Sequence, residues 1–203
     1  MTYEAKNYEN LIGLENFSEQ MLKNHFTLYQ GYVTNFNKVS SALAQMAAED
    51  KLESPEHNEL RRRLGWEFNG VRLHEYYFEN LTKEKTTLTK GSPLELQISK
   101  DFGSVESWEK QFRATGAMRG IGWAMLCYDE NSGSLFNIWI NEHDTGHFAG
   151  SKPILIMDVF EHAFMTDYQL KKADYIEAFM KNVNWSAVEN RMEQYTPAMK
   201  KAG

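Results

Sequence analysis

The sequence has a single cysteine, Cys127, among its 203 residues. A disulfide framework and a thiolate metal cage are therefore excluded. The sequence also lacks an apolar run long enough to span a membrane, and its first six residues, Met1-Thr2-Tyr3-Glu4-Ala5-Lys6, contain no apolar signal core. We expect a soluble, cytoplasmic protein with no membrane partner.

The chain has no excess of positive charge either. It carries 22 Lys and Arg against 28 Asp and Glu, which gives a formal net charge of −6. Nucleic-acid binding depends on Lys and Arg that neutralise phosphates, so we expect no nucleic-acid partner. The tightest basic cluster, Arg61-Arg62-Arg63, is flanked by Glu59 and Glu67, which favours a solvated helix face.

The apolar residues, 42% of the chain, are spaced as in an α+β protein. Residues 1–14 show no strong period, and we place them on the surface. Two long helices follow and form a hairpin, with Phe68 among the residues we expect to be buried. A three-stranded antiparallel sheet surrounded by helices comes next. We predict a helical-hairpin domain over 1–86 and an α/β domain over 87–203. The predicted helices cover 18–50, 55–81, 93–101, 104–117, 174–183 and 186–195, and the predicted strands 123–128, 135–140 and 154–157.

The last predicted strand, Ile154 to Met157, leads directly to Asp158, and His162 follows four residues later. A carboxylate that leaves a buried strand beside an imidazole is costly unless a cation or hydrogen bonds satisfy both groups. A first-row metal ion would satisfy both. The alternative is a helix start in which Asp158 caps free N–H groups and His162 is incidental.

Two further histidines, His25 and His74, lie on the two predicted long helices. Each alone is equally typical of a core histidine, but together the hairpin offers one imidazole from each arm. A site built from these and from Asp158 and His162 would lie at the junction of the two parts, where cofactor sites often form. Three imidazoles and one carboxylate without a thiolate favour iron or manganese over structural zinc.

Along most of its length, the chain resembles a known family, the iron/manganese superoxide dismutases. The strongest segment, Asp158-Val159-Phe160-Glu161-His162-Ala163-Phe164, is similar to the family pattern D-x-[WF]-E-H-A-[FY]. The resemblance implies disproportionation of superoxide to dioxygen and hydrogen peroxide, one Fe or Mn ion per subunit, and a homodimer or higher homo-oligomer. The other matching segments are His25 with Tyr32-Val33-Thr34-Asn35, His74 with Tyr76-Tyr77-Phe78, and Gly122-Trp123.

The resemblance also implies residue roles. Tyr32 corresponds to the tyrosine that gates the substrate funnel, and Trp123 to a tryptophan that walls the pocket. Glu161 corresponds to the carboxylate that reaches across the dimer interface to a metal-binding histidine of the other subunit. The four implied protein ligands, with a water or hydroxide as the fifth, are His25, His74, Asp158 and His162.

The family places a Gln or a His in hydrogen-bonding contact with the metal-bound solvent. The position from which the Gln arises on the second helix is Gly70 here, which has no side chain. The family's other source for this residue is the loop about fifteen residues before the aspartate ligand, and that position is His143 here. The resemblance therefore implies His143 in this role, bonded to the solvent and to Tyr32. His57 and His147 we expect on the surface.

Some positions depart from the family. Tyr32 follows His25 by seven residues rather than eight, which leaves open whether Tyr29 or Tyr32 guards the funnel; the segment after Tyr32 favours Tyr32. Tyr29 stands where the better-known members carry a histidine, and Met165 stands where they carry its tyrosine partner. Both members of that cross-subunit pair are replaced, which leaves open whether a proton route through it exists.

Two other classes of protein remain as alternatives. A mononuclear iron oxygenase usually has two His and one carboxylate, and a fourth protein ligand argues against it. A non-enzymatic homologue would use its metal only to hold the two parts together. The same four ligands serve iron and manganese, so the sequence does not choose between the ions.

Overall fold

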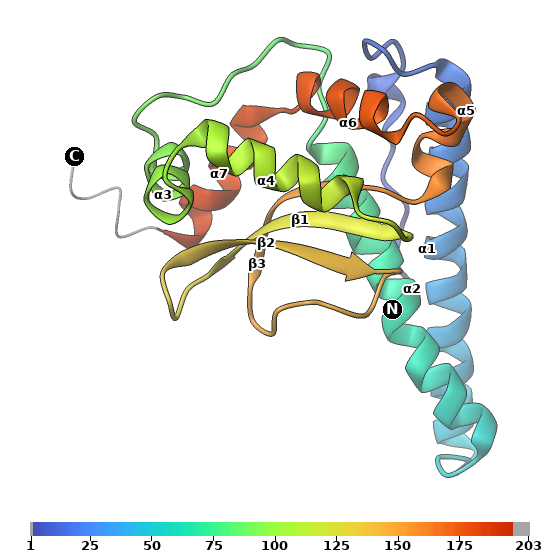
Figure 1. Ribbon diagram of the computed structural model, residues 1–203. Helices are drawn as coiled ribbons and strands as arrows, with labels where there is room; N and C mark the ends of the chain where they lie inside the picture. The colour runs from blue at the N-terminus through green and yellow to red at the C-terminus, as the bar shows by residue number, and fades with distance from the viewer. Residues whose placement is uncertain (1, 197–203) are drawn as a thin grey trace.

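The computed structural model describes residues 2–196 and consists of a helical hairpin followed by a three-stranded sheet with helices around it. Figure 1 shows α1 and α2 side by side, with the hairpin tip extending past the sheet and the other helices gathered away from that tip. This is the α+β fold that the sequence predicts. The helices are α1 (Glu19–Ala48), α2 (Pro55–Glu79), α3 (Pro93–Phe102), α4 (Val105–Ala117), α5 (Met165–Tyr168), α6 (Lys172–Lys181) and α7 (Trp185–Tyr195), the 3-10 helices are η1 (Glu9–Leu11) and η2 (Glu161–Ala163), and the strands are β1 (Gly122–Asp129), β2 (Ser134–Asn141) and β3 (Lys152–Asp158).

Side-chain caps start both hairpin helices. The Ser18 hydroxyl accepts a hydrogen bond from the Met21 N–H at 3.0 Å, and the Ser54 hydroxyl accepts one from the His57 N–H at 3.1 Å. Pro55 at the first helical position needs no hydrogen-bond partner for its nitrogen. The two predicted helices are confirmed to within two residues at each end.

The sheet has the order β2-β1-β3, and both pairs of strands are antiparallel. The start of β1 therefore lies beside the ends of both neighbours: Trp123 pairs with Ile140 of β2 and with Asp158 of β3. This register brings the last residue of β3 and the loop after β2 to the same end of the sheet. Asp158 and His143 consequently leave the sheet close together.

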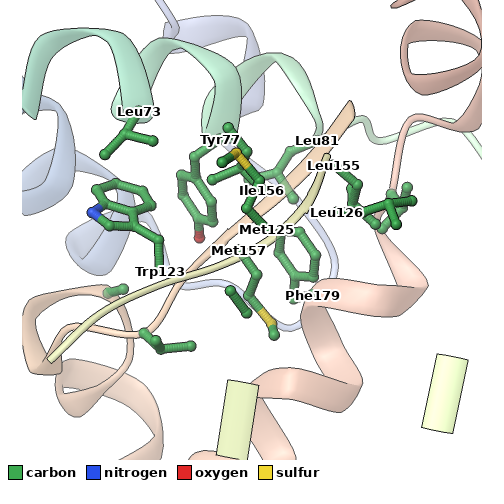
Figure 2. Packing of buried hydrophobic residues seen from close by; sticks show 14 of the residues in the cluster. Leu73, Tyr77, Leu81, Trp123, Met125, Leu126, Leu155, Ile156, Met157 and Phe179 are labelled. Carbon is green, nitrogen blue, oxygen red and sulfur yellow. The ribbon is translucent and has the colours of Figure 1, made fainter. Parts of the chain in front are cut away.

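One hydrophobic cluster joins the hairpin to the sheet. Figure 2 shows Leu73, Tyr77 and Leu81 of the α2 region facing side chains from the strands and Phe179 of α6. The rings of Tyr77 and Phe179 stack with centroids 5.8 Å apart. Because this cluster spans the predicted boundary between 1–86 and 87–203, the hairpin is held at a fixed place against the sheet.

Three expectations about burial are wrong. Leu11 and Leu14 are buried in the hydrophobic cluster, although we placed residues 1–14 on the surface. Phe68 is 41% exposed, and its ring contact is Phe36 of α1, with the two ring centroids 5.5 Å apart. His57 is buried at 8% exposure, and neither ring nitrogen has a hydrogen-bond partner among the described residues.

Short helical segments around the last strand were not predicted. The turn η2 and the four-residue helix α5 follow β3, and α5 is too short for a hydrophobic period to form. None of the helices in residues 2–196 has the length and apolarity that a membrane crossing requires. The predicted second domain runs to residue 203, and its last seven positions lie outside the described residues.

Candidate metal centre

Four side chains from three regions of the chain converge at the junction of the hairpin and the sheet. His25 comes from α1, His74 from α2, Asp158 from the end of β3 and His162 from η2. Their candidate ligand atoms all lie within 4.8 Å of one another, and no other such group of three or more occurs in residues 2–196. The sequence predicted these four residues as one site, and the structure brings them together.

The three imidazoles point at one oxygen atom. Nε2 of His25 lies 3.1 Å from Oδ2 of Asp158, and Nε2 of His162 lies 3.2 Å from the same oxygen. Nε2 of His74 lies 3.7 Å from it. The other oxygen of Asp158, Oδ1, accepts the backbone N–H of Phe160 at 2.9 Å, which fixes the carboxylate plane. One carboxylate oxygen and three ring nitrogens thus surround a common point.

The surroundings of His74 fit a metal ligand. Its Nδ1 lies 2.6 Å from the carbonyl oxygen of Gly70, and since a carbonyl only accepts, Nδ1 carries the proton. In the neutral ring Nε2 then holds a lone pair, and this buried atom has no hydrogen-bond partner among the described residues. A lone pair held in this way is what a metal ion requires of histidine. The residues present therefore fit a first-row ion.

Burial sets the protonation states that metal binding needs. It lowers the pKa of His25, and lowers that of His74 well below the ordinary value, so both rings are neutral at neutral pH. Burial alone would raise the pKa of Asp158, but its interactions with His162 and His25, hydrogen bonds included, outweigh burial and hold that pKa well below the usual range. The site thus offers an anionic carboxylate beside the neutral rings of His25 and His74.

Tyr32, His143 and Trp123 form a chain of hydrogen bonds beside this cluster. The indole Nε1–H of Trp123 donates to Nδ1 of His143 at 3.0 Å, and Nε2 of His143 lies 2.7 Å from the Tyr32 hydroxyl. Because an indole only donates, the proton of the neutral His143 ring is on Nε2, which donates to Tyr32. The hydroxyl hydrogen of Tyr32 is then available for another acceptor. Both nitrogens of His143 have protein partners, so any bond from His143 to metal-bound solvent is shared with Tyr32.

The two tyrosines on α1 have different surroundings. Tyr32 is half-buried, and its ring lies over Gly70, where an added Cβ would come within 2.5 Å of Cδ1 of Tyr32. Gly70 therefore makes the room in which Tyr32 sits. Tyr29 is 1% exposed, and its hydroxyl donates to the buried carboxylate of Glu75 at 2.9 Å and accepts the backbone N–H of Lys6 at 3.0 Å.

Residues that the sequence did not single out complete this region. Trp66 of α2 packs against both Tyr32 and His143, with ring centroids 5.5 and 4.5 Å away. Glu67, which flanks the exposed cluster Arg61-Arg62-Arg63, is buried and paired to Arg63 at 2.7 Å. The sequence offers one signal for the contacts of Trp66: it lies about two helical turns before His74, so both side chains lie on one face of the helix.

His147 is exposed, as expected, but its Nε2 lies 2.9 Å from the carbonyl oxygen of His143 and so supports the loop. Trp123 is fully buried, with its ring centroid 5.0 Å from that of His74. Glu161 is exposed and lies next to His162, whose side chain, 26% exposed, is the most accessible of the four.

The fold and the four-residue cluster define a class of protein with a candidate site for one metal ion between a helical hairpin and a small sheet. Residues 90–191 match the family model for the C-terminal domain of iron/manganese superoxide dismutases. The chain is 33% identical over 199 residues to a superoxide dismutase [Fe] of Aquifex pyrophilus, covering 94% of this chain and 91% of the relative. It is 35% identical over 180 residues to superoxide dismutase [Mn] 2 of Haloferax volcanii, covering 88% of each chain.

The chain belongs to the iron/manganese superoxide dismutase family. It is an oxidoreductase that disproportionates superoxide to dioxygen and hydrogen peroxide with one Fe or Mn ion. Its relatives include proteins named for iron and proteins named for manganese.

The buried His143 predicts an acid-sensitive stability. Burial lowers the pKa of His143 from 6.5 to about 4. Between these values the unfolded chain binds a proton that the folded chain does not, so the free energy of unfolding falls as the pH falls. A His143→Gln variant removes this proton, and we expect its stability to fall less steeply below pH 6.5, by about 1 kcal/mol per pH unit. Urea unfolding of the metal-free proteins between pH 4 and 7 measures the difference, and parallel curves would contradict the neutral state of His143.

Proposed function

We propose that His25, His74, Asp158 and His162 are the four protein ligands of the iron or manganese ion. The observation that carries this proposal is the convergence of three Nε2 atoms on Oδ2 of Asp158. The buried, unpartnered lone pair of His74 supports it independently. Ligands drawn from both parts of the fold would make the site dependent on how those parts pack.

The ion, when bound, supplies a one-electron acceptor for one superoxide and a one-electron donor for the next. Formation of hydrogen peroxide also consumes two protons, and we propose that the Tyr32 hydroxyl holds one of them. Burial raises the pKa of Tyr32 far above neutrality, so the hydroxyl keeps its proton at neutral pH. The bond from Nε2 of His143 occupies a lone pair of this hydroxyl and orients its hydrogen toward another acceptor.

Tyr32 is the better candidate for the funnel residue. It is half-buried, whereas Tyr29 is buried and engaged with Glu75 and the backbone of Lys6. Trp123 would wall the inner side of the pocket, with the aromatic ring of Phe160 beside it at a centroid distance of 6.1 Å. Such rings exclude water and keep the hydrogen bonds of the site strong.

We further propose that the chain forms a homodimer in which Glu161 reaches a metal-binding histidine of the other subunit. Support comes from the exposure of Glu161 and of the neighbouring His162 on one side of the site.

We also propose that 1–86 and 87–203 are the two domains. A cytoplasmic location is consistent with the free, buried Cys127 and is tested by cell fractionation.

Replacing His74 with Ala removes the imidazole whose lone pair has no other partner. We expect a loss of metal affinity of at least about 100-fold, since one inner ligand contributes more than an outer-shell partner. Metal per chain after dialysis, measured by elemental analysis, gives the result. His57→Ala is the matched control, because His57 is a buried histidine outside the cluster and should leave one ion per chain. A full complement of metal in His74→Ala would contradict the ligand set.

Replacing Tyr32 with Phe removes the proposed proton holder and keeps its ring. We expect kcat to fall about tenfold with metal content unchanged, because proton transfer by a positioned group contributes on that scale or above. Tyr29→Phe is the control, and it should lower stability through the lost bond to Glu75 while kcat stays as in the natural chain. Pulse-radiolysis kinetics separates the two, and the opposite pattern would assign the role to Tyr29.

Replacing Glu161 with Ala tests the proposed bridge between subunits. We expect association to weaken by about tenfold or more, since a charged interface contact is lost, together with loss of metal. Sedimentation over a concentration series measures the association constant. Glu161→Gln keeps an acceptor oxygen, and its association constant should lie between those of the natural chain and of Glu161→Ala. An association state that is the same in all three proteins would count against the bridge.

A further inference from the structure

The hydrogen bond between His143 and Tyr32 joins two segments that are 111 residues apart in the sequence. Tyr32 belongs to the rigid helix α1, whereas His143 belongs to the loop between β2 and β3. Its geometry therefore depends on whatever holds that loop against the hairpin. Loops are the more mobile partners in such contacts unless side chains fix them.

Trp66 of α2 occupies the position between these two segments. Its ring contacts Tyr32 and His143, with centroids 5.5 and 4.5 Å away. Its indole Nε1–H donates to Oε2 of Glu142 at 3.2 Å, and Glu142 is the residue immediately before His143. One side chain of the hairpin thus contacts the loop twice, through its ring and through its N–H.

The indole of Trp66 also has a charged partner on its own helix, Arg63. The guanidinium of Arg63 lies 3.8 Å from the centroid of the Trp66 ring. Arg63 in turn donates through Nε to Oε1 of Glu67 at 2.7 Å, and the side chain of Glu67 is only 3% exposed. A pair that contains a buried carboxylate is costly to break, because the carboxylate is left without its cation. Arg63 therefore limits movement of the indole.

The backbone of Glu142 needs such support. Its φ is +49°, a left-handed conformation that a residue other than glycine keeps only where its surroundings hold it. Its N–H donates to the carbonyl oxygen of Ile121 at 3.1 Å, which ties the loop to the start of β1. The bond from Trp66 to the Glu142 side chain adds the tie to the hairpin.

We propose that Trp66 and Glu142 are a positioning pair, which aligns Nε2 of His143 on the Tyr32 hydroxyl across the junction of the hairpin and the sheet. This inference rests on the proposed roles of Tyr32 and His143 and deepens them. Neither Trp66 nor Glu142 takes part in the chemistry itself. They act through the position of the loop, and their loss leaves the four proposed metal ligands in place.

The test compares Trp66→Phe, which keeps a ring without the N–H, with Glu142→Ala and Glu142→Gln. We expect Trp66→Phe and Glu142→Ala each to lower kcat about tenfold at unchanged metal content, because misalignment of a proton donor is costly on that scale. The double variant should be no slower than either single variant, since both remove the same bond. Glu142→Gln keeps an acceptor oxygen for the indole and should retain the natural rate.

A second readout does not depend on activity. The Trp123 indole N–H donates to Nδ1 of His143, so its exchange with solvent reports how firmly the loop holds that ring. In the full chain loaded with diamagnetic zinc, NMR should show exchange about tenfold faster in Trp66→Phe and Glu142→Ala, by loss of local protection. Trp108→Phe is the matched control: it removes an indole bond to Asn137 of 3.1 Å in the sheet domain and should leave Trp123 exchange unchanged.

The outcomes separate this inference from the proposed function. Unchanged exchange and unchanged rates in both Trp66→Phe and Glu142→Ala, with a slow Tyr32→Phe, would overturn the positioning pair and leave the function standing. If the natural chain loaded with iron and with manganese showed no turnover, the proposed function would fail, and the exchange measurement would still decide the pair. Should Trp66→Phe not fold, Glu142→Ala gives the same decision.

Discussion

The structure depends on one shared atom, Oδ2 of Asp158, at which three imidazoles are aimed. The carboxylate belongs to the end of a buried strand, and two of the three rings come from helices that reach it only when the hairpin packs on the sheet. Bringing these groups together removes Asp158, His25 and His74 almost completely from water and His162 in large part, which costs free energy unless the groups find partners. If these four residues hold the ion, as we propose, a bound cation offsets that cost, and metal binding is linked to the folding of both parts.

The same junction places the groups that we propose act on protons. The antiparallel register puts the end of β3 and the loop after β2 at one end of the sheet, so that His143 lies beside the metal cluster and across from α1. Trp123 fixes which nitrogen of His143 carries the proton, and Gly70 leaves the space that the Tyr32 ring fills. The chain carries Tyr29 and Met165 in place of the family's cross-subunit pair, but Tyr32, His143 and Trp123 are still joined by hydrogen bonds. Trp66 connects these residues to the hairpin.

The long elements and the four clustered residues were predictable from the sequence because their signals are local. Ser18 and Ser54-Pro55 mark helix starts, and the segment from Asp158 to Phe164 carries a specific pattern. Contacts between elements were not predictable. The ring contact between Tyr32 and Trp66 joins the two hairpin helices, and the bond from Trp66 to Glu142 joins residues 76 positions apart. Phe68 follows the helical period of a buried residue, yet it is 41% exposed with Phe36 of α1 as its ring contact, and only the packed structure reveals this.

We propose that one ion is shared by His25, His74, Asp158 and His162. Anomalous diffraction at the iron or manganese absorption edge, from crystals of the protein loaded with that ion, tests this sharing. We expect one strong peak per chain within bonding distance of Nε2 of each histidine and of Oδ2 of Asp158. A peak bonded to fewer than these four residues, or located elsewhere in the chain, would contradict it.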